Sequence, residues 1–307
     1  WNISRQIVWG IRIPAWKCKD CGMWIVTEGN TPASCEGKCD CECKNLVQDE
    51  DTFDTWFSSG QWPFATLQTS KKGDFEEFYP TTVMETGYDI LRWWVARMVM
   101  VGLYETKQVP FENIVLHGLV NDPLGKKMSK SKGNVVNPLE LVDTYGADAV
   151  RFALSYGTAL GNDQSLSFSK LEAMRNFTNK LWNMARFIEM KKVSSIKYQV
   201  LSIEELKKIA INKNDKAMIE KTEKLSSDVT RLLEKYDFNH AAQALYDFTW
   251  HVFADKYIED VKNRIDKDSY LILNSLYLIL LQLLHPFMPF VTEEIYKRLW
   301  GREECLI

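Results

Sequence analysis

The sequence predicts an α/β unit, residues 1–168, followed by an all-α helical unit, residues 169–307. Short apolar runs separated by turns fill the first part, which is typical of buried strands that alternate with helices. In the second part the apolar residues recur at helical spacing, and charged helical patterns follow. A chain of 307 residues, 46% of them hydrophobic, is long enough to bury a sizeable core in one or two domains.

The first part contains a strand–helix–strand pattern. We expect a strand at residues 78–85, a tight turn at Gly87, an apolar helix at residues 89–104 and a second, parallel strand at residues 114–120. Ligands of open α/β sheets bind beyond the carboxyl ends of the strands. The turn and the segment after the second strand are therefore expected to share one nucleotide site.

Helix start signals mark the following segments. Asn137 and Pro138 are expected to begin a helix as N-cap and first helical residue. Ser169 and Glu172 have the spacing of a capping box, so the helical unit is expected to start there. The apolar stretch 271–291 is interrupted by polar residues and prolines, which favours a buried helix ending at Pro286 over a membrane span. Three charged helices are expected before it, at residues 201–208, 216–236 and 240–264.

Six of the seven cysteines lie within residues 18–43. Cys18 and Cys21, followed by a glycine, have the C-x2-C spacing that brings two thiolates onto one tetrahedral metal. Two of the four later cysteines would complete the site, and their uneven spacing leaves open which two: Cys35, Cys39, Cys41 and Cys43. We favour a structural Zn²⁺ knuckle at residues 16–46 over chance clustering or a freestanding zinc ribbon that binds nucleic acid.

The charge balance conceals a basic patch. A net charge of −3 argues against a nucleic-acid partner, because phosphate neutralisation supplies much of such affinity. Residues 170–224, however, contain thirteen Lys and Arg against seven Asp and Glu, a local excess of six positive charges. Charged helices are usually only solvated surfaces, so this patch gives weak support to a nucleic-acid partner.

The most informative segment is the lysine-rich loop at residues 125–134, with the sequence GKKMSKSKGN. Its glycines let the backbone approach a ligand closely, its hydroxyls and amides donate hydrogen bonds, and its four ammonium groups attract negative charge. This combination is typical of a polyphosphate site. The alternative is a solvated lysine turn.

The order KMSKSKGN resembles the KMSKS signature of the class I aminoacyl-tRNA synthetases. Other segments resemble the isoleucyl and valyl branch of that family, and two of them, IPAW at residues 13–16 and DTWFSS at residues 54–59, favour the valyl-tRNA synthetases. Downstream segments resemble the helical anticodon-binding domain of that branch, among them HPFMPF at residues 285–290. The remaining resembling segments are WNISRQ at 1–6, TGYDI at 86–90, HGLV at 117–120, RNF at 175–177 and NKLWN at 179–183.

The resemblance implies the C-terminal half of a Rossmann-like catalytic domain with a zinc-knuckle insertion, followed by a truncated helical anticodon-binding domain. It implies ATP-dependent ligation of valine to tRNA(Val) through valyl-adenylate, with ATP, Mg²⁺ and Zn²⁺ present. Lys127 and Lys130 are implied to act on the β- and γ-phosphates, and Trp56 and Ile90 to contact the valine side chain. The implied ATP site consists of Gly87, Asp89, His117, Gly118, Met128, Ser129, Lys130 and Ser131.

Two alternatives stay open, a fragment of an isoleucyl-tRNA synthetase and a non-catalytic module that binds tRNA or is stabilised by zinc. An intact phosphate loop argues against the second, because a pure binding module has little use for it. None of the four histidines belongs to a HIGH-type motif. The chain is therefore expected to be an internal fragment, without the editing domain and inactive alone, of a monomeric cytoplasmic enzyme that binds no membrane.

Overall fold

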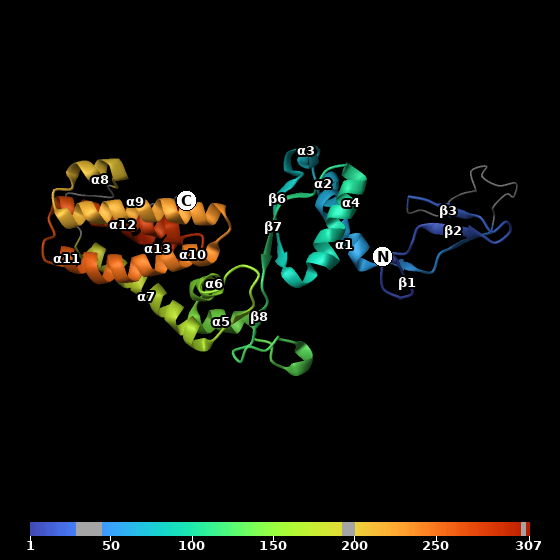
Figure 1. The fold of residues 1–307 in the computed structure, drawn as a ribbon, viewed down its shortest axis with the longest axis horizontal. Coiled ribbons are helices and arrows are strands. Elements are labelled where there is room, and N and C mark those ends of the chain that lie inside the picture. The colour runs from blue at the N-terminus through green and yellow to red at the C-terminus, as the bar shows by residue number, and fades with distance from the viewer. Residues whose placement is uncertain (29–44, 192–199, 302–304) are drawn as a thin grey trace. The chain divides into compact units, whose positions relative to one another are not determined.

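The computed structural model describes residues 1–28, 45–191, 200–301 and 305–307 (Figure 1). It divides into two compact units, Trp1–Leu116 and His117–Ile307. Each unit has its own cluster of buried apolar side chains. The change from α/β to all-α character predicted near residue 169 falls inside the second unit.

The first unit begins with two small antiparallel sheets. β1 (Ser4–Arg5) pairs with β5 (Thr52–Phe53), while β2 (Ala15–Cys18) lies between β3 (Trp24–Val26) and β4 (Leu46–Gln48). Three of the four residues of β2 are buried, as expected for the central strand. The β2–β3 hairpin carries the first two cysteines.

A third sheet follows three short helices: α1 (Thr55–Gly60), α2 (Trp62–Thr69) and α3 (Asp74–Phe78). It consists of β6 (Thr81–Gly87) and β7 (Phe111–His117). The N–H of Thr81 donates to the carbonyl of Pro110 at 3.0 Å, so the two strands start side by side and run in the same direction, as the sequence predicts. The predicted strand at 78–85 begins three residues too early, because α3 ends only at Phe78.

The helix predicted at residues 89–104 has a more complex start. It consists of a 3-10 turn η1 (Tyr88–Ile90), a π-helical stretch η2 (Leu91–Val95) and the α-helix α4 (Ala96–Thr106). One face of this segment is anchored by Val95 and Met98, which are 1% and 0% exposed and pack with Met84 and Phe111. The core therefore lies between the helical crossover and the sheet.

The second unit begins with a small parallel sheet and two helices. β8 (Val120–Asn121) pairs with β9 (Gln164–Ser165), and α5 (Pro138–Tyr145) and α6 (Ala147–Ser155) lie between them in the chain. Asn137 caps α5 through a bond from the Leu139 N–H at 3.0 Å, and Pro138 is the first helical residue. Both predictions for this helix start are confirmed.

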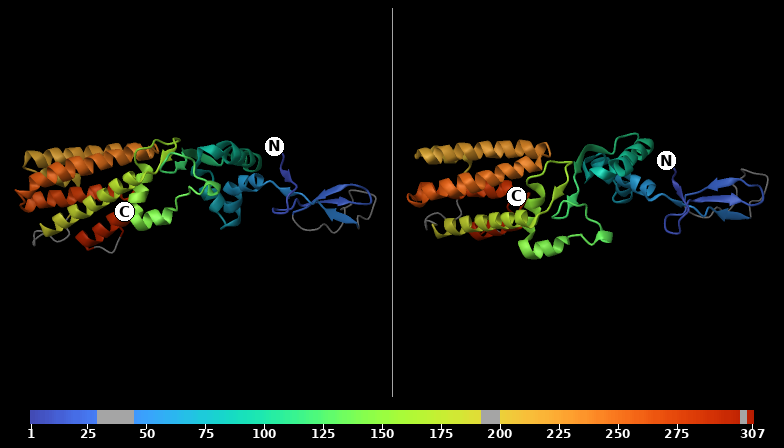
Figure 2. Two further views of the ribbon diagram at one scale, coloured as in Figure 1. Left: turned by 90° about the horizontal axis from the view of Figure 1, so that it is seen from below. Right: turned by 60° about the horizontal axis from the view of Figure 1, so that its bottom comes forward.

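A bundle of helices completes the second unit, and Figure 2 shows its long helices lying along one another. The bundle elements are α7 (Phe168–Met190), α8 (Ile203–Ile209), α9 (Lys213–Glu234), α10 (Phe238–Asp247), η4 (Phe248–Ile258), α11 (Glu259–Lys262), α12 (Lys267–Leu284) and α13 (Pro289–Trp300). Of these, α10, η4 and α11 form one continuous helical segment, with η4 in π-helical geometry.

The helix start predicted at Ser169 is wrong by two residues. Ser167 is the N-cap of α7, and its hydroxyl accepts the Lys170 N–H at 3.3 Å, while Ser169 already lies in the first turn. A complete capping box occurs instead at α8, between Ser202 and Glu205. Residues 169–172 and 202–205 both contain a serine three residues before a glutamate. Only Ser202 caps its helix, because Ser167 takes that position at α7.

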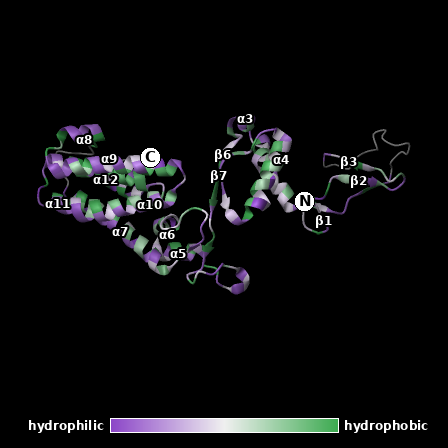
Figure 3. Ribbon diagram, viewed as in Figure 1, coloured by the Kyte–Doolittle hydropathy of each residue, from purple (hydrophilic) through white to green (hydrophobic). Residues whose placement is uncertain are grey.

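The apolar helix α12 forms the centre of the bundle. Its hydrophobic colouring stands out in Figure 3, and most of its side chains are buried. It ends at Leu284, just before Pro286, which confirms the predicted buried helix. Within the described residues, no helix combines the length and apolar character that crossing a bilayer requires.

Helix α6 clamps the turn that joins α12 to α13. The carboxylate of Asp148 accepts the N–H groups of Phe290 and Val291 at 3.2 and 2.6 Å, and Arg151 donates to the carbonyl groups of Pro286 and Phe287. Burial raises the pKa of Asp148, and the two amide bonds oppose that shift. The HPFMPF segment thus fixes α6 on the bundle.

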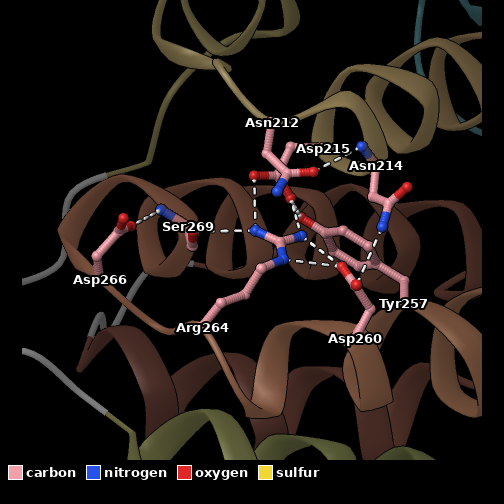
Figure 4. Close-up of polar contacts among 8 residues, drawn as sticks. All are labelled: Asn212, Asn214, Asp215, Tyr257, Asp260, Arg264, Asp266 and Ser269. Atoms are coloured by element: carbon pink, nitrogen blue, oxygen red, sulfur yellow. Dashed lines mark hydrogen bonds and ion pairs between the residues drawn. The ribbon is translucent and has the colours of Figure 1, made fainter.

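A polar network around Arg264 ties three helices together (Figure 4). Its guanidinium group binds both oxygens of Asp215 on α9 at 2.7 and 3.0 Å, and also binds Asp260 on α11 and Ser269 on α12. The Asp215 side chain is 3% exposed and also accepts the Tyr257 hydroxyl at 2.9 Å. These hydrogen bonds replace the bonds to water that the buried Asp215 carboxylate has lost.

Candidate active site

The lysine-rich segment leaves β8 through a short hairpin. The N–H of Asp122 donates to the carbonyl of Lys126 at 2.9 Å, and the N–H of Gly125 donates to the carbonyl of Asp122 at 2.9 Å. Gly125 has a φ of +78°, which a glycine adopts without strain. Asn121 then forms an antiparallel bridge with Lys127. The hairpin therefore fixes the position of Lys127, the first residue of the KMSKS sequence.

The carboxylate of Asp122 lies at the centre of this hairpin and is 5% exposed. Its Oδ1 accepts the N–H groups of Leu124 and Lys126 at 3.0 and 2.8 Å, and its Oδ2 accepts from Nδ2 of Asn134 at 2.9 Å. The bond from Asn134, followed by the bond from the Lys126 amide, holds the pKa of Asp122 below its usual range. The group is therefore a carboxylate throughout the neutral pH range.

Asn134 bonds to the signature backbone on both sides of Met128. Its Oδ1 accepts the Ser129 N–H at 2.9 Å, and its Nδ2 donates to the Lys127 carbonyl at 3.2 Å. The half-buried Met128 accepts the Val136 N–H on its sulfur at 3.4 Å. The amide and the thioether together hold the middle of the loop.

The signature side chains extend from this backbone. Lys127 and Lys130 are exposed, and Lys130 opens the 3-10 turn η3 (Lys130–Lys132). The hydroxyls of Ser129 and Ser131 lie 3.1 Å apart. In the part of the chain that the structure describes, no carboxylate forms an ion pair with any lysine of residues 125–134, so these ammonium groups can bind an incoming anion.

His117 is the last residue of β7, and Gly118 follows it before β8. The exposed His117 ring has its Nδ1 2.8 Å from the Gly118 carbonyl oxygen. A Cβ atom at Gly118 would lie 1.8 Å from the carbonyl oxygen of Asn162. Because this oxygen belongs to the backbone, only glycine fits, and the close approach lets β9 pair with β8.

Gly87, Asp89 and Ile90 belong to the first unit. Gly87 is the buried last residue of β6, with φ −64° and ψ 139°, so the predicted tight turn at this glycine is wrong. The chain turns instead at η1, where Asp89 is exposed and Ile90 half buried. An exposed carboxylate directly beyond the carboxyl end of a strand is well placed to accept hydrogen bonds from a ligand.

Trp56 lies on α1, which contacts η2, and Ile90 directly precedes η2. Trp56 is half buried. Another indole, Trp94, follows Ile90 by about one helical turn, and its Nε1 donates to the Ser59 carbonyl at 3.3 Å. The sequence signal that points to Trp94 is its four-residue spacing from Ile90, which would place both residues on one face of a regular α-helix.

A buried ion pair anchors α1 to α4. Asp54, 5% exposed, accepts the Trp1 Nε1 at 2.8 Å and the Arg97 guanidinium at 3.3 Å, and Arg97 also lies over the Trp1 ring at 4.1 Å. Arg5 approaches the same carboxylate at 3.4 Å. These partners are 43 to 53 residues apart in the sequence, so no local pattern announces them.

The cysteine segment is described only in part. Cys18 is buried at the end of β2 and Cys21 is exposed, and the Gly22 N–H closes the turn between them on the Cys18 carbonyl at 2.8 Å. Gly22 has a φ of +74°. No group of three potential metal ligands is found among the described residues, and four predicted ligands lie outside those residues: Cys35, Cys39, Cys41 and Cys43.

Two protein-family models match the chain. Residues 1–167 match the tRNA synthetases of class I for isoleucine, leucine, methionine and valine. Residues 215–307 match the anticodon-binding domain of tRNA ligases.

Curated relatives match along the whole chain. The chain is 47% identical to the valine–tRNA ligase of Clostridium acetobutylicum, a match that covers 100% of this chain and 35% of that protein. It is 44% identical to the valine–tRNA ligase of Thermotoga maritima, over 97% of this chain and 34% of that protein. The chain thus spans about a third of the length of these relatives.

Two solved structures share the fold. One is the ternary complex LeuRS–tRNA–LeuAMS of Agrobacterium radiobacter K84, with a TM-score of 0.78 and 23% identity, over 100% of this chain and 42% of that chain. The other is the methionyl-tRNA synthetase of Mycobacterium tuberculosis in complex with methionyl-adenylate, with a TM-score of 0.67 and 20% identity, over 96% of this chain and 53% of that chain.

Proposed function

This chain belongs to the class I tRNA synthetases of the isoleucine, leucine, methionine and valine group, and we propose that it forms part of a valine–tRNA ligase. The observation that carries the proposal is 47% identity to one such ligase along the whole chain, together with an organised KMSKS loop. The isoleucyl alternative is not favoured, since the relatives in question are valine–tRNA ligases.

The proposed reaction begins with attack of the valine carboxylate on the α-phosphate of ATP. Valyl-adenylate forms and pyrophosphate leaves. A hydroxyl of tRNA(Val) then takes the valyl group as an ester, and AMP leaves. Lys127 and Lys130 would neutralise the charge that grows on the departing pyrophosphate, which is the usual way such sites lower the barrier. Mg²⁺, bound to ATP, would supply further charge neutralisation. Asp89 would accept hydrogen bonds from the ribose hydroxyls.

Further residues would shape the pockets for ATP and valine. Met128, Ser129 and Ser131 would support or extend the phosphate loop, and we assign Gly87, His117 and Gly118 to the ATP site as the resemblance implies. We assign the valine side chain to Trp56 and Ile90 and add Trp94, whose indole bonds to the Ser59 carbonyl of α1. Such an apolar pocket selects by size and discriminates poorly against threonine, which has the same shape as valine.

The helical unit would bind tRNA(Val). Its residues 215–307 match the anticodon-binding domain of tRNA ligases, and its basic stretch at 170–224 supplies positive charge. Binding through such charges is expected to weaken as salt concentration rises. The whole enzyme is proposed to act as a monomer in the cytoplasm.

Pyrophosphate exchange tests the proposed activity. The whole protein that carries this chain should exchange label between pyrophosphate and ATP fastest with valine, and more slowly with isoleucine or threonine. The isolated 307 residues should show no exchange, because no HIGH-type motif is present in them. Faster exchange with isoleucine would contradict the assignment of valine, and full activity of the isolated residues would contradict the division of the active site.

A structural Zn²⁺ fits the part of the cysteine segment that the structure describes. The Gly22 N–H bond to the Cys18 carbonyl at 2.8 Å closes the C-x2-C turn at the end of the β2–β3 hairpin. This geometry is suited to two thiolate ligands from Cys18 and Cys21, with two more from the segment at 35–43. The metal would stabilise a segment too short to fold by burial alone.

Metal analysis of the purified chain should find about one zinc per molecule. Replacing Cys18 with Ser should release the metal, because a serine hydroxyl is a much poorer ligand for Zn²⁺ than a thiolate. The matched control is Cys305→Ser, which should keep the full metal content. A folded sample that contains no zinc without any chelator treatment would refute the site.

A further inference from the structure

We propose that Asp122 and Asn134 are positioning residues that set the geometry of the KMSKS loop for phosphate binding. The proposal rests on the proposed function and assigns roles to two residues outside the five KMSKS residues at 127–131. Asn134 bonds to their backbone, and Asp122 bonds to the Lys126 N–H just before them. Their side chains bond to each other at 2.9 Å, twelve residues apart in the chain. Together they close the loop at its base.

Asp122 holds the entrance of the loop. Its Oδ1 takes two backbone N–H groups, at Leu124 and Lys126, and so fixes the turn that leads into the signature. An acceptor-only carboxylate suits this position, because all three of its partners are donors. The 5% exposure of Asp122 means that water cannot easily replace a lost bond.

Asn134 connects Asp122 to the backbone that carries the lysines. It bonds to the Lys127 carbonyl and to the Ser129 N–H, so the backbone that carries Lys127 and directly precedes Lys130 is held on both sides. The two lysine side chains are long and exposed, and only their backbone is fixed before a ligand arrives. Small misplacement of such charged groups costs about 100-fold in rate in well-organised sites.

The pairing allows only one orientation of the Asn134 amide. Its oxygen must face the Ser129 N–H, which turns its NH₂ group toward the Asp122 carboxylate and the Lys127 carbonyl. In an Asp122→Asn variant, the Asn side chain must keep its oxygen toward Leu124 and Lys126. Two NH₂ groups would then face each other, and the pair would break.

A reciprocal exchange tests the pairing in the whole ligase. Asp122→Asn should lower kcat for valine-dependent pyrophosphate exchange by about 10- to 100-fold, with KM for valine unchanged. Asn134→Asp should do the same, because two carboxylates would meet. The double exchange Asp122→Asn with Asn134→Asp restores one donor facing one carboxylate and keeps the net charge. It should recover activity to within about five-fold of the unmodified enzyme, the remaining loss reflecting the missing bond to Lys127.

The measurements separate this proposal from its rivals. Unchanged kcat in both single variants would overturn the proposal. A double variant whose loss in kcat equals the product of the two single losses would also overturn it, because paired side chains should restore activity when both are exchanged. The control Asp266→Asn, at the N-cap of α12, removes an exposed carboxylate that also accepts a backbone N–H, and should leave exchange unchanged. Absence of valine-dependent exchange in the unmodified whole protein would instead contradict the proposed function.

Discussion

Replacing Lys130 with Ala in the whole ligase should lower kcat for valine activation by about two orders of magnitude, or about 3 kcal/mol of transition-state stabilisation. Lys130 is exposed, carries no ion pair among the described residues and starts the 3-10 turn that the Gly133 N–H closes on the Lys130 carbonyl at 3.2 Å. Its charge should matter most when negative charge moves onto pyrophosphate. KM for valine should therefore hardly change, and steady-state exchange kinetics measure both quantities.

The matched control for Lys130 is Lys132→Ala, which removes an equal charge from the same turn. Only Lys127 and Lys130 match the signature lysines, so Lys132→Ala should lower kcat for valine activation by less than about ten-fold. Equal losses in the two variants would mean that the loop acts through its total charge. A Lys130 variant impaired only in KM for valine would contradict a contact with the phosphates.

Replacing Asp215 with Ala should lower the free energy of unfolding by about 3–5 kcal/mol, the usual cost of removing one partner of a buried ion pair. The substitution leaves the Arg264 guanidinium without its bidentate partner and the Tyr257 hydroxyl without its acceptor. It also removes the bonds by which Asp215 ties the start of α9 to Arg264 and Tyr257, and leaves there the bond from Asn214 to Asp260 (Figure 4). Urea unfolding followed by circular dichroism measures the change.

Asp260→Ala is the control for this network. Asp260 binds the same Arg264, but its side chain is 33% exposed, against 3% for Asp215. Water can hydrate the arginine once Asp260 is gone, so the loss should be about 1 kcal/mol or less. If both variants lose the same stability, burial is not what makes the Asp215 pair important.

The sequence predicts those parts of the fold that local chemistry decides. Asn137 and Pro138 start α5 as expected, because the cap and the first helical residue act within one turn. The serine at 169 fails as a helix start, since Ser167 competes for the same role and the fold selects it. Gly87 fails as a turn residue because a glycine can also end a strand in extended geometry.

In the candidate site, too, local sequence reveals some residues, while others come together only through tertiary packing. The lysine loop can be found because all its signature residues are consecutive in the chain. The Asp122–Asn134 pair cannot be found by spacing alone, although the Asp-Pro-Leu-Gly sequence at 122–125 does signal the turn that Asp122 organises. The bonds of Asp54 to Trp1 and Arg97 depend on tertiary packing and have no local signal.

Esterification of labelled valine to tRNA by the whole protein tests the central claim most directly. A mixed tRNA pool is incubated with ATP and either valine or isoleucine, and the charged species are identified. We expect valine to accumulate on tRNA(Val), and we expect the Lys130→Ala variant to charge it at about a hundredth of that rate. Charging of a different tRNA, or charging that proceeds with isoleucine and not with valine, would contradict the claim.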